Sequence, residues 1–201
     1  TAAHLKKKLG KKTPIKTATF LTSLVDFSDA GDLGVFIDDK QINMLEQRMS
    51  EKGYLEGEQM AQTFSMIRAN DMIWSFYVNN YLMGKDPFPF DILYWNSDST
   101  RLPATVHTFY LRQMYQKNLL AKKNGLTING TPIDLSLIDI PTYVLSTKED
   151  HITPWESTYK ATKLYTGKQK FVLSGSGHVA GAINPPAKNK YCYWTNDTIE
   201  S

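Results

Sequence analysis

Cysteine is almost absent from this chain of 201 residues, which contains only Cys192. A single cysteine excludes an internal disulfide framework and is typical of a reducing compartment. The sequence also lacks any apolar run that approaches the length of a membrane-spanning helix. Its formal net charge is only +3, which is too small to indicate a nucleic-acid partner. The remaining composition, 41% hydrophobic and 21% charged residues, is that of an ordinary globular protein.

A glycine-rich stretch, Ser174–Gly181, contains one histidine, His178. The run 170–173 before it predicts a short buried strand, and the glycines allow the backbone to turn sharply. A histidine just past a strand end can carry a proton to and from a nucleophile when an acid holds its other ring nitrogen. The alternative is a loop histidine that makes only structural hydrogen bonds.

The candidate acid is Asp150, which follows a predicted strand at 142–146. After it, Thr153–Glu156 has the pattern of a capping box with proline at the first helical position, which predicts a helix start. The order strand, Asp, helix, strand, His, with His178 28 positions after the acid, is that of the closing βαβ unit of an α/β-hydrolase. Because ligands bind at the carboxyl ends of the strands in such sheets, we expect the two side chains to meet there.

The rest of the chain completes an α/β pattern. A segment rich in β-branched and apolar residues predicts a further buried strand at 17–25, and Asn129-Gly130 predicts a β-hairpin. Apolar residues recur at helical spacing from Met60 to Leu82, which predicts core packing for most of them and an inserted lid between the strand regions. Helices are expected over residues 1–12, 39–52, 56–82 and 102–121. The expected fold is α/β-hydrolase-like, with a mostly parallel sheet and a helical lid insertion.

The nucleophile elbow of an α/β-hydrolase, Gly-x-Ser-x-Gly or Gly-x-Cys-x-Gly, does not occur in this sequence. Ser176 has its glycines at the adjacent positions, and Cys192 follows the histidine without elbow glycines. The simpler interpretation of Cys192 is a small, partly buried apolar residue. We therefore expect residues 1–201 to be the C-terminal part of an α/β-hydrolase-like catalytic domain, a partial domain with its lid at about 29–98.

Several long motifs resemble those of one family, the class I polyhydroxyalkanoate synthases. The resemblance covers nearly the whole chain in the right order, and its acid and histidine motifs include Asp150 and His178. The matching segments are Arg68–Asp71, Phe90–Pro103, Glu149–Trp155, Gly175–Gly181 and Asn184–Lys190.

The resemblance implies an acyltransferase that polymerises (R)-3-hydroxyacyl-CoA, chiefly 3-hydroxybutyryl-CoA, into storage polyester and releases CoA. The family's nucleophile is a cysteine, which would lie outside this chain, and His178 would activate it. Asp150 would orient the imidazole, and His151 would supply a supporting hydrogen bond. Lys188 and Lys190 are weak candidates for contacts with CoA phosphates, although solvated surface lysines are at least as good an interpretation.

The resemblance also implies where the parent protein acts and with what. It needs no cofactor or metal, because the CoA thioester is the substrate. Its partners are the polyester granule and a second copy of itself, bound through the lid as a homodimer. It is cytoplasmic, at the surface of the granules, and has neither a nucleic-acid partner nor a transmembrane segment. This chain alone is expected to be inactive.

Two other functions fit the residues. An esterase or depolymerase of the α/β-hydrolase fold would use the same aspartate and histidine but pass the acyl group to water. A non-catalytic piece would only dimerise or bind granules. The identity of the elbow residue and of the acyl acceptor would distinguish a hydrolase from a synthase. A covalent thioester probe that labels the parent protein, but not its His178→Ala variant, would favour an enzyme over a non-catalytic piece.

Overall fold

The structure is a computed structural model that describes residues 1–87, 95 and 98–196. The chain divides into two compact units, one of Thr1–Asp38 with the chain from Tyr110 onward, the other of Asp39–Phe109. The second unit overlaps the lid expected at about 29–98 but begins and ends later, so those lid bounds stay a prediction. Part of the motif Phe90–Pro103 lies outside the described residues.

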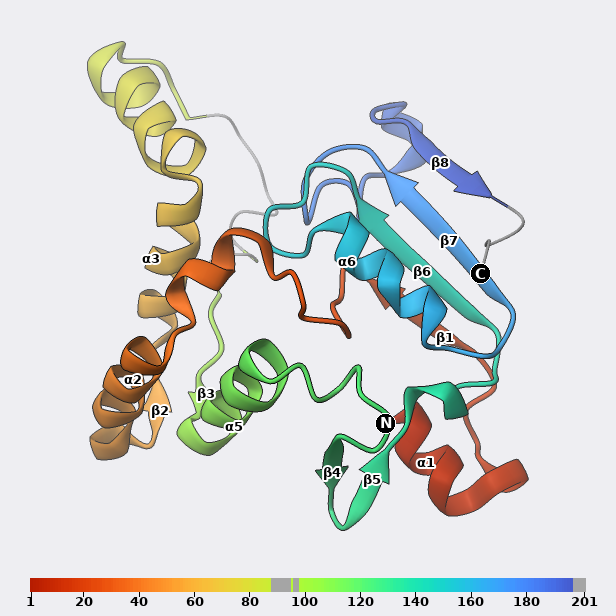
Figure 1. The fold of residues 1–201 in the computed structure, drawn as a ribbon. Helices are drawn as coiled ribbons and strands as arrows, with labels where there is room; N and C mark the ends of the chain where they lie inside the picture. The colour runs from red at the N-terminus through yellow and green to blue at the C-terminus, as the bar shows by residue number, and fades with distance from the viewer. Residues whose placement is uncertain (88–94, 96–97, 197–201) are drawn as a thin grey trace. The chain divides into compact units, whose positions relative to one another are not determined.

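The first unit contains a four-stranded sheet in the order β1-β6-β7-β8 (Figure 1). Strands β1, β6 and β7 run parallel, and β8 pairs with β7 in the antiparallel direction. This arrangement confirms the predicted α/β fold with a mostly parallel sheet. The strand bounds are β1 Ala18–Leu21, β6 Thr142–Thr147, β7 Gln169–Ser174 and β8 Tyr193–Asn196.

Strand β1 is shorter than the 17–25 expected from its composition. It ends at Leu21 because Thr22 has a positive φ of 43°, which a β-branched residue adopts only with strain. The Thr22 N–H still donates to the carbonyl oxygen of Leu145 at 2.8 Å, which ties the strand end to β6. The chain therefore leaves the sheet at the edge where β6 also ends.

Short helices and a hairpin surround this sheet (Figure 1). The hairpin is confirmed, with Asn129 and Gly130 at φ of 48° and 71° in its turn. Helix α6 packs on β6 within the βαβ unit. The bounds are α1 Ala2–Leu9, η1 Gly10–Lys12, β4 Leu126–Ile128, β5 Thr131–Ile133, η6 Leu135–Leu137, α6 Trp155–Lys160, η7 Ala161–Lys163 and η8 Pro186–Lys188. A short 3-10 helix, η2 Gly31–Phe36, precedes the second unit.

A hydrophobic cluster holds these elements together. Each leucine or isoleucine side chain that it buries contributes about 1.5–3 kcal/mol relative to an exposed one. Phe20 of β1 packs against the cluster, and its ring lies tilted against that of Tyr165 with ring centroids 5.4 Å apart. Its buried members are Ala3, Leu126, Ile133, Leu135, Ile138, Ala161 and Tyr165.

Both predicted bounds of the helix expected over 102–121 are wrong. The chain instead forms β3 (Leu102–Pro103), α5 (Ala104–Phe109) and a π-helical segment, η5 (Tyr110–Gln116). Beyond η5, Asn118 has a positive φ of 49°. Its side chain accepts from the Phe27 N–H and donates to Asp26, each at 2.9 Å, so the loop after β1 ends the helix.

The second unit is mainly helical. Helix α2 (Asp39–Lys52) confirms the predicted bounds, and β2 (Tyr54–Leu55) pairs with β3 in the antiparallel direction. The expected helix 56–82 is α3 (Gly57–Ile67) followed by the π-helical segments η3 (Asn70–Trp74) and η4 (Tyr77–Leu82).

The prediction that most apolar residues of the helical run 56–82 pack in a core is wrong for the second half of the run. Trp74, Tyr81 and Leu82 are 55%, 74% and 61% exposed. No helix among the described residues is both long and apolar enough to span a bilayer.

Candidate active site

The acid, Asp150, lies in the turn that follows β6. The Asp150 N–H donates to the carbonyl oxygen of Thr147, the last residue of the strand, at 3.2 Å. The Asp150 carboxylate oxygen Oδ1 accepts from the backbone N–H groups of Ile152 and Thr153, which follow it in the turn, at 2.9 and 2.8 Å. A short aspartate side chain is suited to this local turn, and the turn fixes the direction of the carboxylate.

The histidine, His178, lies in the loop that follows the neighbouring strand β7. Ser176 has φ of 76° in this loop, so the chain bends sharply just before the histidine. Two backbone hydrogen bonds join the loops after β6 and β7: Lys148 N–H to Ser174 O at 2.8 Å and Glu149 N–H to Ser176 O at 3.1 Å. Parallel pairing of the strands brings both loops to one edge of the sheet, so residues 28 positions apart become neighbours.

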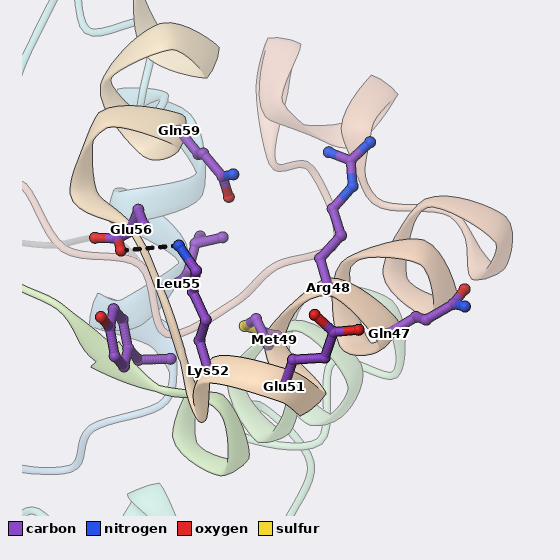
Figure 2. A pocket seen from close by; sticks show the side chains of 9 residues that line it. Gln47, Arg48, Met49, Glu51, Lys52, Leu55, Glu56 and Gln59 are labelled. Carbon is purple, nitrogen blue, oxygen red and sulfur yellow. Dashed lines mark hydrogen bonds and ion pairs between the residues drawn. The ribbon is translucent and has the colours of Figure 1, made fainter.

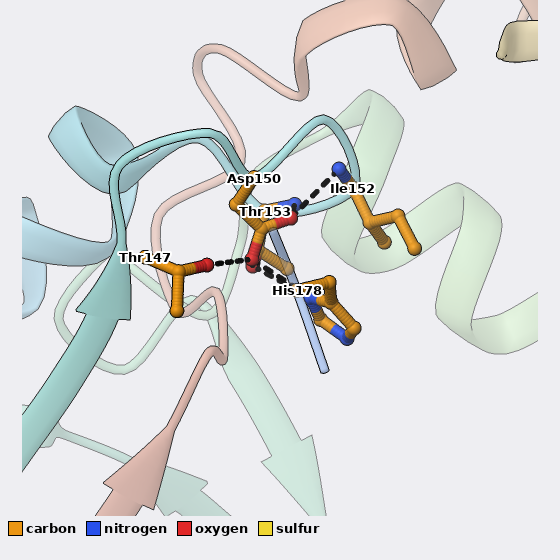
Figure 3. A network of polar contacts seen from close by, with 5 residues as sticks. All are labelled: Thr147, Asp150, Ile152, Thr153 and His178. Carbon is orange, nitrogen blue, oxygen red and sulfur yellow. Dashed lines mark hydrogen bonds and ion pairs between the residues drawn. The ribbon is translucent and has the colours of Figure 1, made fainter. Parts of the chain in front are cut away.

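Asp150 and His178 are in direct contact (Figure 3). The His178 Nδ1 atom lies 2.8 Å from Asp150 Oδ2. The Asp150 side chain is fully buried, whereas that of His178 is 28% exposed. The predicted meeting of these two side chains is therefore observed, while their catalytic roles stay predictions.

The surroundings keep the carboxyl group ionised. Burial by itself raises the pKa of Asp150, but hydrogen bonds from His178 and Thr153 outweigh it and hold the pKa below the ordinary value of 3.8. An ionised carboxylate can only accept hydrogen bonds, so His178 Nδ1 carries the proton that faces it. In the neutral ring the other nitrogen, Nε2, has a lone pair and can accept a proton.

Thr153 does not cap helix α6, which corrects the capping-box prediction. The helix begins at Trp155, and Pro154 takes the capping position with an extended ψ of 133° and no side-chain hydrogen bond. The Thr153 hydroxyl instead donates to Asp150 Oδ2 at 2.7 Å. Sequence reasoning therefore missed Thr153 as a site residue, and its position three residues after the acid was the available signal.

The structure places the other residues predicted from the family pattern without testing their roles. His151 follows the acid in the same turn and is half-buried. Lys188 ends η8, and Lys190 follows it; both are exposed. A supporting bond from His151 and phosphate contacts by the two lysines stay predictions.

Cys192 is exposed, which corrects its expected partial burial. Its carbonyl oxygen accepts from the Gly175 N–H at 2.7 Å, so its backbone flanks the histidine loop. Among the described residues, no hydrogen bond joins His178 to a serine hydroxyl or a cysteine thiol. Within the described part of the chain, the pair is therefore an acid and a base to which no serine or cysteine nucleophile is bonded; the hydroxyls that contact it are those of Thr147 and Thr153.

A separate pocket of about 360 Å³ lies in the second unit (Figure 2). Lys52 and Glu56 form an ion pair at 3.3 Å at its side. None of the predicted site residues lines it, and the described residues contain no group of three or more His, Cys, Asp or Glu side chains that could hold a metal. The lining residues are Gln47, Arg48, Met49, Glu51, Lys52, Tyr54, Leu55, Glu56 and Gln59.

Comparison with known proteins adds sequence relatives. The chain is 55% identical over 181 residues to the poly(3-hydroxyalkanoate) polymerase subunit PhaC of Rhizobium meliloti, a match to 90% of this chain and 30% of that protein. It is 51% identical over 182 residues to the poly(3-hydroxyalkanoate) polymerase of Methylorubrum extorquens, covering 90% and 30%. It is 46% identical over 191 residues to the poly(3-hydroxyalkanoate) polymerase subunit PhaC of Cupriavidus necator, a match to 92% of this chain and 32% of that protein.

The chain thus spans about a third of the length of the curated relatives that it matches. These similarities confirm the resemblance to polyhydroxyalkanoate synthases. Residues 32–185 also match a family described as alpha/beta hydrolase fold. That match covers more than half of the chain and includes both Asp150 and His178. The chain therefore belongs to the alpha/beta hydrolase fold family.

Proposed function

We propose that this chain is the acid- and histidine-bearing segment of a polyhydroxyalkanoate synthase, with the nucleophilic cysteine supplied from outside it. One observation carries the proposal: the hydrogen bond of 2.8 Å between buried Asp150 and His178 at the carboxyl ends of parallel strands. In an α/β-hydrolase this is the position of the acid and base of the catalytic triad. The 46–55% identity to three poly(3-hydroxyalkanoate) polymerases supports the choice of reaction.

The proposed mechanism uses His178 twice in each cycle. Its Nε2 takes the proton of the cysteine thiol, and the thiolate attacks the carbonyl carbon of an (R)-3-hydroxyacyl-CoA thioester. When the carbon–sulfur bond to CoA breaks, the imidazolium returns the proton to the CoA thiolate. Nε2 then removes the proton from a 3-hydroxyl group, whose oxygen attacks the carbonyl carbon of the enzyme-bound thioester. The new ester bond forms as the bond to the cysteine sulfur breaks, and the imidazolium returns its proton to that sulfur.

In this scheme Asp150 acts on the imidazole alone. Its carboxylate fixes the ring with Nδ1 protonated and stabilises the positive charge that the ring gains at each proton transfer. Asp150 is fully buried, so water does not screen this interaction.

The proposal extends to the partners of the parent protein. It would act in the cytoplasm at the surface of polyester granules, as a homodimer, with CoA thioesters as substrates and no cofactor. The exposed apolar residues of η3 and η4, such as Trp74 and Tyr81, support contact with an apolar partner. We propose that the isolated chain has no polymerase activity, because in the part of the chain that the structure describes no serine hydroxyl or cysteine thiol is hydrogen-bonded to His178.

Hydrolysis of an ester is the alternative reaction for the same pair. It would use water in place of the 3-hydroxyl group, and Asp150 and His178 would perform the same proton transfers. The names of the relatives favour polymerisation. The acyl acceptor therefore has to be measured.

A chimera tests both reactions. This chain replaces the matching 181 residues of the Rhizobium meliloti polymerase, and the purified chimera receives 3-hydroxybutyryl-CoA. We expect CoA release with polymer formation, a loss of at least about a thousandfold in His178→Ala, and normal rates in the control His4→Ala on α1. Release of free 3-hydroxybutyrate without polymer would replace the synthase with a hydrolase. Turnover by the isolated chain that disappears in Cys192→Ser would make Cys192 the nucleophile and overturn the proposal.

A further inference from the structure

The carboxylate oxygen that His178 uses also binds two threonine hydroxyls (Figure 3). Asp150 Oδ2 accepts from Thr153 Oγ1 at 2.7 Å and from Thr147 Oγ1 at 3.2 Å, beside the His178 Nδ1 at 2.8 Å. Thr147 is fully buried, and Thr153 is 8% exposed. Water therefore does not replace these donors, and each of them shares the charge of one oxygen with the imidazole.

Thr153 has a larger part in this arrangement than Thr147. Its backbone N–H binds Oδ1 at 2.8 Å while its hydroxyl binds Oδ2, so it holds both oxygens of Asp150. Its Oγ1 also lies 3.4 Å from His178 Nδ1. Since the hydroxyl proton is directed at the nearer oxygen, the oxygen of Thr153 turns its lone pairs toward the Nδ1 proton. The position of the imidazole is thus bounded by two oxygens, from Asp150 and Thr153.

We propose that Thr153 is a positioning residue of the Asp150–His178 pair, which fixes the imidazole by holding the carboxylate and limits how strongly that carboxylate retains a proton on the ring. A donor bound to a carboxylate oxygen withdraws part of its negative charge. The base must gain a proton in one step and release it in the next, so an acid that held the imidazolium too tightly would slow the release. The role in catalysis rests on the proposed function, but the contact can be tested without turnover.

The other charges near His178 are the same in every variant compared, so they cancel in the test. Among the described residues, Asp150 is the one ionisable side chain in hydrogen-bond or ion-pair contact with His178. Lys148, in the neighbouring loop, has its ammonium group over the Trp194 ring, 5.0 Å from the centroid. The difference in the imidazole titration between two variants therefore reports on the group at which the variants differ.

Nuclear magnetic resonance of the ¹⁵N-histidine-labelled chain gives the readout, since the sequence has only four histidines. In Thr153→Val we expect the titration midpoint of the His178 ring to rise by about 0.5–1 pH unit, because the carboxylate keeps more charge for the imidazolium. Thr153→Ser restores the midpoint. The matched control is Thr162→Val, which removes a buried hydroxyl bound to the Tyr159 carbonyl oxygen at 2.7 Å on α6; it leaves the midpoint unchanged.

Two results would overturn the proposal: an unchanged or lower midpoint in Thr153→Val, or a serine variant that behaves like valine. If Thr153→Val does not fold, the unaltered chain decides. Above the midpoint, the ¹⁵N shifts must show the proton on Nδ1, and the Thr153 hydroxyl proton must exchange slowly; a proton on Nε2 or a rapidly exchanging hydroxyl contradicts the arrangement. Because no substrate is used, failure of the polymerase chimera would leave these results intact.

Discussion

At the scale of single residues, the feature that distinguishes Asp150 is the number of hydrogen-bond donors that surround its carboxylate. Its two oxygens accept from Ile152, from Thr153 twice, from Thr147 and from His178. A carboxylate offers about four lone-pair sites, so these donors saturate it. A buried charge is tolerated only when it is paired and fully hydrogen-bonded, and here that condition is met by residues of two adjacent loops.

This saturation predicts a pH-dependent cost for Asp150→Asn. The variant keeps the size of the side chain but loses the charge and turns an amide donor toward other donors, so we expect the free energy of unfolding at pH 7 to fall by about 2–4 kcal/mol. The folded-state pKa of Asp150 is below its ordinary value of 3.8, so the unfolded chain takes up the proton first as the pH falls. The advantage of aspartate over asparagine is thus complete above pH 4 and shrinks as the pH drops through the folded-state pKa.

Urea unfolding of both proteins from pH 7 down to pH 3 measures this difference. Other acids, such as Asp26 and Asp139, also have lowered pKa values, but they are common to both proteins and cancel. A stability difference that stayed constant down to pH 3 would contradict the assignment of Asp150 as an ionised, paired carboxylate.

The sequence was sufficient to find Asp150 and His178, because each follows a strand whose apolar pattern is unambiguous. It was not sufficient to find Thr153. A threonine before Pro-Trp-Glu satisfies the capping-box pattern, and only the folded turn shows that its hydroxyl binds the acid at 2.7 Å. A sequence pattern describes interactions between residues that are close along the chain. The contact of Thr153 depends on the position of the Asp150 carboxylate, which is also bound by His178 in the loop after another strand.

At the scale of elements, the two site loops are held together by close backbone packing at Gly181. A methyl group at Gly181 would lie 2.5 Å from both the Gly175 carbonyl oxygen and the Thr147 Cγ2. Gly181 itself is buried, and its N–H donates to the Gly177 carbonyl oxygen at 3.0 Å. The turn that contains His178 therefore leaves no space for a side chain where it meets the end of β6.

We predict that Gly181→Ala lowers the free energy of unfolding by about 1–3 kcal/mol, because backbone atoms on one side cannot move away cheaply. The matched control lies in the same loop: at Gly177 the nearest atom to a new methyl group is the Glu149 carbonyl oxygen at 3.9 Å, which is ordinary contact. Urea unfolding of the two variants is the measurement. Equal stability of Gly181→Ala and Gly177→Ala would contradict the close approach.

The element bounds that sequence reasoning missed have physical causes in long-range contacts. Strand β1 ends early because Thr22 turns with a positive φ, which no propensity scale assigns to threonine. The helix expected to reach residue 121 ends before Asn118, because the Asn118 side chain is hydrogen-bonded to Asp26 and to the Phe27 N–H in the loop after β1. Helix α2, the hairpin and the presence of the three parallel strands were predicted correctly because their own periodicity and turn residues determine them.

At the scale of the whole molecule, each compact unit has an apolar or unpaired surface. In the first unit, β1 pairs with β6 on one side, and within the described residues no strand pairs with its other side. In the second unit, the helical residues from Trp74 to Leu82 include several exposed apolar side chains. An open strand edge and an exposed apolar face both favour association, so the isolated chain is expected to self-associate.

The edge of β1 allows a test by a single proline. The N–H groups of Ala18 and Thr22 donate to Pro141 O at 3.1 Å and Leu145 O at 2.8 Å on the β6 side. Because successive residues alternate along a strand, the N–H of Thr19 faces the open edge. Proline at such a position removes an outward donor without breaking the ladder.

We predict that Thr19→Pro shifts the chain toward monomer in light scattering at micromolar concentrations, while its circular dichroism stays that of the unaltered chain. Ala18→Pro is the matched control: it removes a donor that β6 uses, so it should lower the free energy of unfolding by about 1–3 kcal/mol and increase aggregation. A different result would locate association elsewhere. If Thr19→Pro stays associated while Tyr81→Lys, a change at the exposed end of η4, gives monomer, then the apolar helical face and not the strand edge drives it.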